Sequence, residues 1–247
     1  MSRNFEILQR GAARPEAFRA SAIPRQGERD TAGRHNRPSA AEQEITKLVQ
    51  RLFIYPATPS PPAVIAFCGV DEGAGCSWVS VRSSEVLAAN VPGRVCLVDA
   101  NLRSPSLHTH FDTEIQTGFA DAMRELAPLR DFTRATWRSH LWLMTAGTVG
   151  SEPNGALNPE RLRARFSQLR EEFDHVLVDT PPINRYPDAL MLGRLADGVV
   201  LVVDSNSTRR ESARVAKENL ESAKISILGA VLNRRTYPIP EALYKRL

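Results

Sequence analysis

The chain has 247 residues, of which 24% are charged and 42% are hydrophobic, as in an ordinary globular protein. No apolar run approaches the roughly 20 residues of a membrane helix, and the first ten residues lack the apolar core of a signal peptide. The net charge of +4 resides in residues 1–40, which hold eight Arg and four acidic residues, while the remainder has 24 of each sign. We therefore expect a cytoplasmic protein.

The three cysteines agree with a reducing compartment. Cys68, Cys76 and Cys96 are odd in number, lack the CxxC spacing and lie within or beside apolar runs. This pattern argues against a disulfide framework and against a zinc site.

Two segments precede the main domain. Residues 1–38 are rich in Arg, Ala, Pro and Gly without apolar periodicity, so we expect a flexible, disordered Arg-rich arm. Residues 39–62 begin with a capping-box pattern, Ser39 and Glu42, and continue with apolar residues at helical spacing. Four prolines in residues 56–62 then favour an extended linker. The pattern predicts an amphipathic helix that docks on another element.

Residues 63–236 form the predicted main domain, followed by a tail at 237–247. Short apolar runs alternate here with helical segments, and continuous apolar strands are typical of a parallel sheet covered on both faces. The fold class is therefore α/β, a doubly wound and mainly parallel sheet. Asn158 with Pro159, and Thr208 with Glu211, predict the starts of two helices. The predicted strands are 63–68, 95–98, 141–144, 175–178, 199–203 and 227–232.

A glycine loop follows the first of these strands. Gly69–Ser77 reads G-V-D-E-G-A-G-C-S and precedes a helical segment, Trp78–Asn90. Strand, glycine loop and helix form a phosphate-binding arrangement, because backbone N–H groups converge at the positive end of the helix. The pattern G-x-x-x-x-G-K-[ST] keeps Gly75 and Ser77, but has Cys76 in place of lysine and Val70 in place of the first glycine.

Two later strands end in an acid. Asp99 follows Val95–Val98, and Asp179 follows His175–Val178. Ligands of open parallel sheets bind at the carboxyl ends of the strands, so the loop and both acids are expected at one crevice. Each acid could instead only cap the segment after its strand.

Together these stretches resemble the Walker A, Walker A′ and Walker B motifs of bacterial tyrosine kinases. These kinases form the capsular-exopolysaccharide group, related to the deviant-Walker ATPases of cell division and partitioning. The resemblance runs from about Ala63 to Asn233. It rests on Gly69–Ser77, on Asp99–Leu107 and on Asp179–Pro182, and it also takes in residues 152–162, including Glu152-Pro153-Asn154, and residues 197–203.

The resemblance implies a site for ATP or ADP with Mg²⁺. Ser77 and Asp179 would serve the metal, and Asp99 would act in catalysis with Asp179. The nucleotide would contact residues of the loop and its neighbours: Gly73, Ala74, Gly75, Cys76, Ser77, Trp78 and Arg103. Phosphoacceptor candidates are Tyr237 and Tyr244, which could equally be ordinary surface tyrosines.

Several departures weaken the expected catalysis. Cys76 replaces the phosphate lysine, Asn101 the second Walker A′ acid and Ala74 the acidic loop residue. Loss of one preorganised donor commonly costs about 3 to 4 kcal/mol of transition-state stabilisation. Arg82 and Arg103 are candidates for a substitute cation. The Cys76 thiol could also be reactive, because a helix N-terminus lowers a thiol pKa.

The sequence thus predicts a kinase-like regulator of exopolysaccharide or capsule biosynthesis, nucleotide-binding with weak or no phosphoryl transfer. The alternatives are an active ATP-dependent protein-tyrosine autokinase and a partitioning-type ATPase that binds DNA or membrane through the arm. The resemblance implies a membrane-anchored polysaccharide chain-length-determinant protein as partner, and recruitment to the inner face of the cell membrane. It leaves homo-oligomerisation open, and we do not expect nucleic acid as a partner.

Overall fold

The computed structural model describes residues 18–21, 39–56, 60–150 and 157–235. Within them the chain forms an eight-stranded sheet with the order β1-β8-β7-β2-β6-β3-β5-β4. Neighbouring strands are parallel except for the pair β4 and β5. The strands are β1 (Phe18–Ser21), β2 (Val64–Gly69), β3 (Val95–Asp99), β4 (Arg134–Ala135), β5 (Leu141–Met144), β6 (His175–Thr180), β7 (Gly198–Asp204) and β8 (Ile227–Arg235). The predicted doubly wound α/β class is confirmed.

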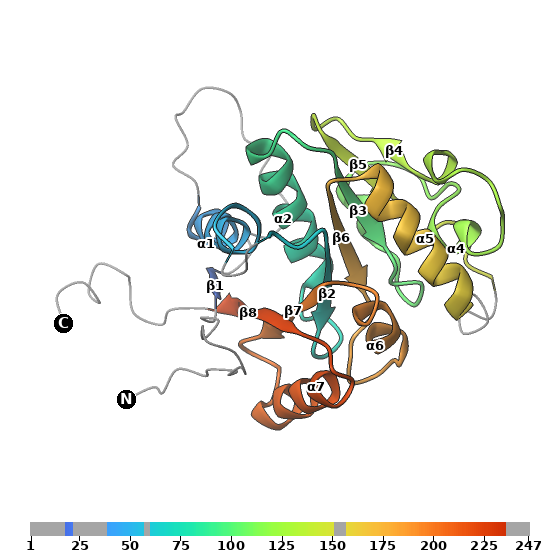
Figure 1. Ribbon diagram of the computed structural model, residues 1–247. Helices are drawn as coiled ribbons and strands as arrows, with labels where there is room; N and C mark the ends of the chain where they lie inside the picture. The colour runs from blue at the N-terminus through green and yellow to red at the C-terminus, as the bar shows by residue number, and fades with distance from the viewer. Residues whose placement is uncertain (1–17, 22–38, 57–59, 151–156, 236–247) are drawn as a thin grey trace, which may run out of the picture.

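Helices cover both faces of this sheet (Figure 1). One layer contains α1 (Ala40–Val49), the π-helix η1 (Gln50–Ile54), α2 (Cys76–Asn90) and α3 (Leu107–His110). The other contains α4 (Phe119–Ala122), the 3₁₀ helix η2 (Leu129–Phe132), α5 (Pro159–Glu172), α6 (Asp188–Gly193) and α7 (Arg210–Ser222). None of the helices in the described part of the chain has the length and apolar character needed to cross a membrane.

Strand β2 shows why the apolar runs are continuous. Ala66 and Cys68 point into the core shared with α5, α6 and α7, whereas Ile65 and Phe67 point into the core shared with α1 and α2. Successive side chains of a strand alternate between faces, so a strand covered on both sides needs an apolar residue at every position. All six predicted strands are present for this reason.

The N-terminal helix also follows its sequence signals. Ser39 caps α1, accepting from the backbone of Glu42, whose side chain accepts from the backbone of Ser39. Its apolar face, with Ile45 and Leu48 fully buried, packs against α2, so the segment 39–56 is part of the main core.

Three differences from the sequence analysis concern local structure. Asn158 caps α5 as predicted, but Thr208 does not cap α7, which begins at Arg210. The Thr208 hydroxyl instead accepts from the backbone N–H of Asp204 at 3.2 Å, which ties it to the end of β7. Strands β1 and β4 were not expected: β1 lies within the predicted arm and pairs with β8, and β4 has only two residues.

Candidate phosphate-binding site

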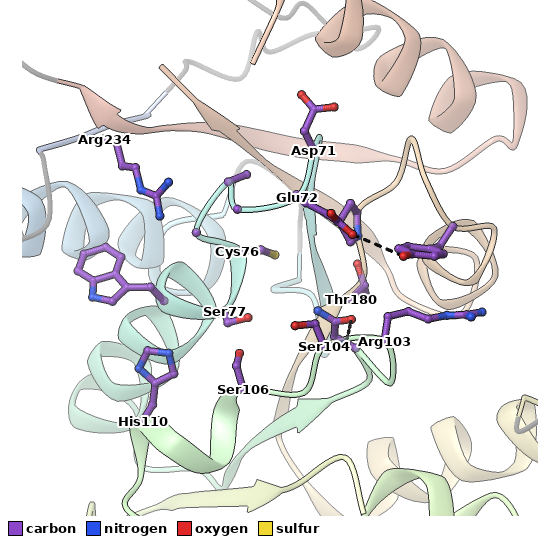
Figure 2. A pocket seen from close by; sticks show the side chains of 18 residues that line it. Asp71, Glu72, Cys76, Ser77, Arg103, Ser104, Ser106, His110, Thr180 and Arg234 are labelled. Atoms are coloured by element: carbon purple, nitrogen blue, oxygen red, sulfur yellow. Dashed lines mark hydrogen bonds between the residues drawn. The ribbon is translucent and has the colours of Figure 1, made fainter. Parts of the chain in front are cut away.

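The carboxyl ends of β2, β3, β6 and β8 meet around one pocket of about 580 Å³ (Figure 2). The order of the sheet explains the location of the pocket. The connection from β2 runs past β6 to β3, whereas the connection from β6 runs past β2 to β7, so the two leave the middle of the sheet in opposite directions. Ligands of open α/β sheets bind at such a point. The pocket is lined by the glycine loop (Gly69, Asp71, Glu72, Gly73, Ala74, Gly75, Cys76, Ser77, Trp78), the segment after β3 (Asn101, Arg103, Ser104, Ser106, His110), the segment around the end of β6 (Thr180, Pro182, Tyr186) and Arg234 of β8.

The glycine loop has the backbone of a phosphate cradle. Gly73 and Gly75 both have positive φ, 75° and 82°, and Gly75 is the N-cap of α2. A Cβ on Gly75 would lie 2.2 Å from Nδ2 of Asn233, so this position needs glycine for space as well as for conformation. The loop thus turns tightly into the N-terminus of a 15-residue helix, where N–H groups are available to an anion.

Val70 occupies the position of the missing first glycine without disturbing the loop. Its backbone N–H donates to Val202 O at 3.0 Å and extends the pairing of β2 with β7, and its side chain is buried in the core. The turn therefore begins after Val70, and the remaining glycines make it.

Asn233 holds the loop from β8. This fully buried amide donates through Nδ2 to Ala74 O at 2.9 Å. A buried carbonyl that would otherwise lack a donor is satisfied in this way, so the contact fixes the loop against the sheet. No sequence signal singled out Asn233, because the contact joins positions 159 residues apart.

Ser77 and Asp179 meet below the loop. The Ser77 hydroxyl donates to Asp179 Oδ2 at 2.5 Å, and Asp179 Oδ1 is buried and accepts no hydrogen bond from the described residues. Burial raises the Asp179 pKa from 3.8 to about 6, against the opposing effect of contacts with Ser77 and Cys76. The sequence predicted this pairing of loop and strand end.

Asp99 lies beside Asp179 in the adjacent strand, since the two are register partners of β3 and β6. Its Oδ2 accepts from the backbone N–H groups of Ser106 and Leu107, both at 3.1 Å, and its Oδ1 is buried without a hydrogen bond from the described residues. Burial, and then the charge of Asp179, raise the Asp99 pKa to about 7. Capping is therefore one role of Asp99, but one oxygen remains unsatisfied.

The oxygen atoms of Ser77 and Asp179 could bind a magnesium ion only together with a nucleotide. Mg²⁺ binds hard oxygen ligands and usually takes one or two carboxylates, waters and substrate phosphates. Ser77 Oγ and the unsatisfied Asp179 oxygen supply protein oxygens. In the described residues no group of three or more His, Cys, Asp and Glu could hold a metal by itself. The remaining ligands would thus come from phosphate and water.

Cys76 stands at the lysine position, at the first residue of α2. Its thiol lies beside Asp179, and burial, followed by that neighbouring charge, raises its pKa well above the usual value. The alternative of a thiol pKa lowered by the helix N-terminus is not supported, because burial and the charge of Asp179 act in the opposite direction. Cys76 adds no charge to the pocket.

The two candidate substitute cations differ in position. Arg82 does not line the pocket, and its guanidinium lies 2.7 Å from Glu85 and 6.0 Å from the Trp78 ring. Arg103 does line it, but it binds Asp188 through Nε at 3.2 Å and Nη2 at 2.9 Å. Arg103 is thereby engaged by an acid of α6.

Sequence patterns did not point to several other pocket residues. His110, the last residue of α3, lines the pocket. Glu72 accepts from the Tyr186 hydroxyl at 3.5 Å and pairs with Arg185, which joins the loop to the segment after β6 (Figure 2). Asn101 accepts from the backbone of Ser104 at 3.2 Å, so it organises its own turn.

Trp78, the third residue of α2, lines the pocket and also packs against the core beneath that helix. Tyr237 and Tyr244 lie outside the described residues, as do Glu152, Pro153 and Asn154.

Residues 63–228, more than half of the chain, match the family described as Cellulose biosynthesis protein BcsQ. The chain belongs to that family. The predicted resemblance to bacterial tyrosine kinases is confirmed by individual relatives. Tyrosine-protein kinase YwqD of Bacillus subtilis is 34% identical over 148 residues, 60% of this chain and 62% of that protein. Putative tyrosine-protein kinase CapB of Staphylococcus aureus is 27% identical over 200 residues, 81% and 87% of the two chains.

Solved structures agree on the fold. The kinase domain of Escherichia coli tyrosine kinase ETK has a TM-score of 0.78 at 20% identity, covering 91% of this chain and 94% of that one. The chimerical protein CapA2B2 has a TM-score of 0.74 at 22% identity, covering 81% and 87%. The septum site-determining protein MinD of Pyrococcus horikoshii, complexed with Mg-ADP, has a TM-score of 0.62 at 21% identity, covering 74% and 76%. The match to YwqD spans less than two thirds of that relative.

Proposed function

We propose that this chain is a kinase-like, nucleotide-binding regulator of exopolysaccharide or capsule biosynthesis with weak or no phosphoryl transfer. The observation that carries the proposal is the intact phosphate loop above Ser77 and Asp179, with Cys76 where the lysine belongs. Backbone N–H groups supply most of the anion cradle, and they do not depend on the side chain at position 76. Binding therefore survives a change that removes catalytic charge.

Phosphoryl transfer needs more than this cradle. It relies on positioning and on neutralising the charge that spreads over the γ-phosphate oxygens. Here the glycine loop contributes no cationic side chain, and the side-chain oxygen of Asn101 accepts a hydrogen bond from the backbone N–H of Ser104. An amide cannot accept a proton from an attacking hydroxyl, so Asp99 and Asp179 are the acids left for that role.

The nucleotide would be ATP or ADP with Mg²⁺. Ser77 and Asp179 would hold the metal, and the loop from Gly73 to Ser77, with Trp78 and Arg103 beside it, would contact the nucleotide. A nucleotide-dependent contact with a membrane-anchored chain-length-determinant protein would then bring the chain to the inner face of the membrane. The relatives named as tyrosine kinases support a nucleotide site in this chain.

Isothermal titration of the purified chain with Mg·ADP and Mg·ATP tests binding, and radiolabelled ATP tests transfer. We expect binding by the wild type, and transfer about 10² to 10³ times slower than in a Cys76→Lys, Asn101→Asp variant. The variant Cys76→Met, with a side chain of similar length and no charge, is the matched control and should not gain transfer. Wild-type transfer as fast as that of the restored variant would refute the degenerate site.

A further inference from the structure

We infer that Arg234 supplies the positive charge that Cys76 does not, by binding the phosphate chain of the nucleotide. The inference rests on the proposed function, since it concerns the same pocket. Arg234 lines the pocket from the end of β8, whereas the lysine that it would replace belongs to the glycine loop (Figure 2).

The backbone of Arg234 is fixed relative to the glycine loop. Its N–H donates to Asn233 Oδ1 at 2.9 Å, and the Asn233 Nδ2 donates to Ala74 O at 2.9 Å. Its carbonyl accepts from Asn206 Nδ2 at 2.9 Å. These bonds hold Arg234 at φ 56°, a left-handed conformation that is uncommon for a residue other than glycine. The Asn233 side chain thus connects the glycine loop to the backbone of Arg234.

The charges of the pocket favour Arg234 over the other cations. Among the residues that the structure describes, two arginines line the pocket. Arg103 is 15% exposed at its side chain and makes two bonds to Asp188. The Arg234 side chain is 42% exposed and, within the described part of the chain, it pairs with one acid, Nη1 to Asp204 Oδ2 at 3.0 Å. A guanidinium has five N–H donors, so this pairing leaves donors for an anion. Arg234 is therefore the better placed to add charge to the pocket.

Asp204 orients the guanidinium without consuming it. Its other oxygen accepts from the backbone N–H of Asn206 at 2.8 Å, so the carboxylate is itself held in place. Although burial opposes ionisation, bonds from Asn206 and Arg234 keep the Asp204 pKa below its usual value. The ion pair holds the guanidinium at the pocket, and an arginine preorganised in this way loses less entropy on binding phosphate.

The test compares ADP with tripolyphosphate, which has the phosphate chain and no base, in the full-length protein with Mg²⁺. Titration calorimetry of Arg234→Gln should show affinity for both ligands weakened about 10- to 100-fold. Arg234→Lys, which keeps the charge, should retain most of the affinity. Arg163→Gln, an exposed position on α5, removes the same charge elsewhere and should bind as the wild type does.

Asp204→Asn separates a structural role from a ligand role. It breaks the ion pair but leaves the guanidinium in the pocket, so ADP affinity should stay within about threefold of wild type. Equal losses in Asp204→Asn and Arg234→Gln would overturn the inference, because the pair would then be structural. Loss for ADP without loss for tripolyphosphate would also overturn it, since Arg234 would then contact the base or ribose. A wild type that binds neither ligand would refute the proposed function and the inference with it.

Discussion

Asp99 and Asp179 place two buried carboxyl groups side by side, and the contribution of Asp99 to the stability of the protein should fall as pH rises. Burial and the charge of Asp179 raise the Asp99 pKa from 3.8 to about 7. A raised pKa means that the folded state binds the proton more tightly than the unfolded chain. The stabilisation is present below about pH 4 and is lost as pH rises toward 7. The interval of about 3 pH units corresponds to about 4 kcal/mol.

The variant Asp99→Asn should remove this penalty. The amide oxygen can still accept from the N–H groups of Ser106 and Leu107, which the carboxylate now binds. At pH 5 the variant should already be more stable by about 1 to 2 kcal/mol, because Asp99 is then ionised in the unfolded chain but still protonated in the folded protein. At pH 8 the variant should be more stable by up to about 4 kcal/mol.

Urea unfolding at several pH values between 5 and 8, followed by tryptophan fluorescence without nucleotide, measures this difference. Comparing variant with wild type cancels acids away from Asp99, such as Asp197 and Asp204, whose lowered pKa values act in the opposite direction. Asp131→Asn, at a side chain 55% exposed, is the control and should show no such change with pH. A difference between Asp99→Asn and wild type that stays constant from pH 5 to 8 would refute the reasoning.

Three further predictions concern the loop. Gly75→Ala should lower the free energy of unfolding by more than the roughly 1 to 2 kcal/mol of a left-handed alanine, because the new Cβ meets Asn233; Asn233→Ala in the same chain should recover part of the loss in urea unfolding. Ser77→Ala removes a donor to Asp179, so Mg·ADP affinity should fall at least about 10-fold by calorimetry, while unfolding changes by about 1 to 3 kcal/mol. Cys76 should react slowly with a thiol probe at pH 8, because its pKa is raised, and mass spectrometry of the labelled chain measures the rate.

The controls for these predictions use neighbouring positions. Gly73→Ala meets no atom within 4 Å, so it should show the conformational cost without the clash. Ser104→Ala removes a hydroxyl from another part of the pocket lining, the segment after β3. Labelling of Cys76 at the rate of a free exposed thiol would contradict the predicted protection. Equal losses of stability in Gly73→Ala and Gly75→Ala would show that the contact with Asn233 does not matter.

Patterns that repeat along the chain predicted the fold well. The strands are read from continuous apolar runs, and the α1 and α5 starts from caps within three residues, so both depend on short-range sequence. Thr208 shows the limit, because its hydroxyl could cap α7 or close the turn after β7. The backbone path of residues 204–208 decides which of these two contacts the Thr208 hydroxyl makes, and here it accepts from the Asp204 N–H.

The site divides along the same line. Gly75, Ser77, Asp99 and Asp179 could be found because each lies at a strand end or helix start with a recognisable neighbour. Asn233 and Arg234 could not, since what gives them a role is contact with residues far away in the sequence. The same reason applies to the Cys76 thiol. Its helix position alone favours a low pKa, but burial and the carboxylate of Asp179, which lies 103 positions further along the chain, raise it.

A lost lysine need not mean a lost ligand, and the arrangement around Cys76 shows why. An ammonium at this position would lie near Asp179, whereas the neutral thiol adds no positive charge there. Burial raises the Asp179 pKa to about 6, and its Oδ1 accepts no hydrogen bond from the described residues. A divalent cation brought by a nucleotide would relieve both. Binding of Mg·ADP should therefore release protons near pH 6, and the enthalpy of binding should depend on the ionisation enthalpy of the buffer. A binding enthalpy independent of the buffer at pH 6 would show that the metal does not reach these carboxylates.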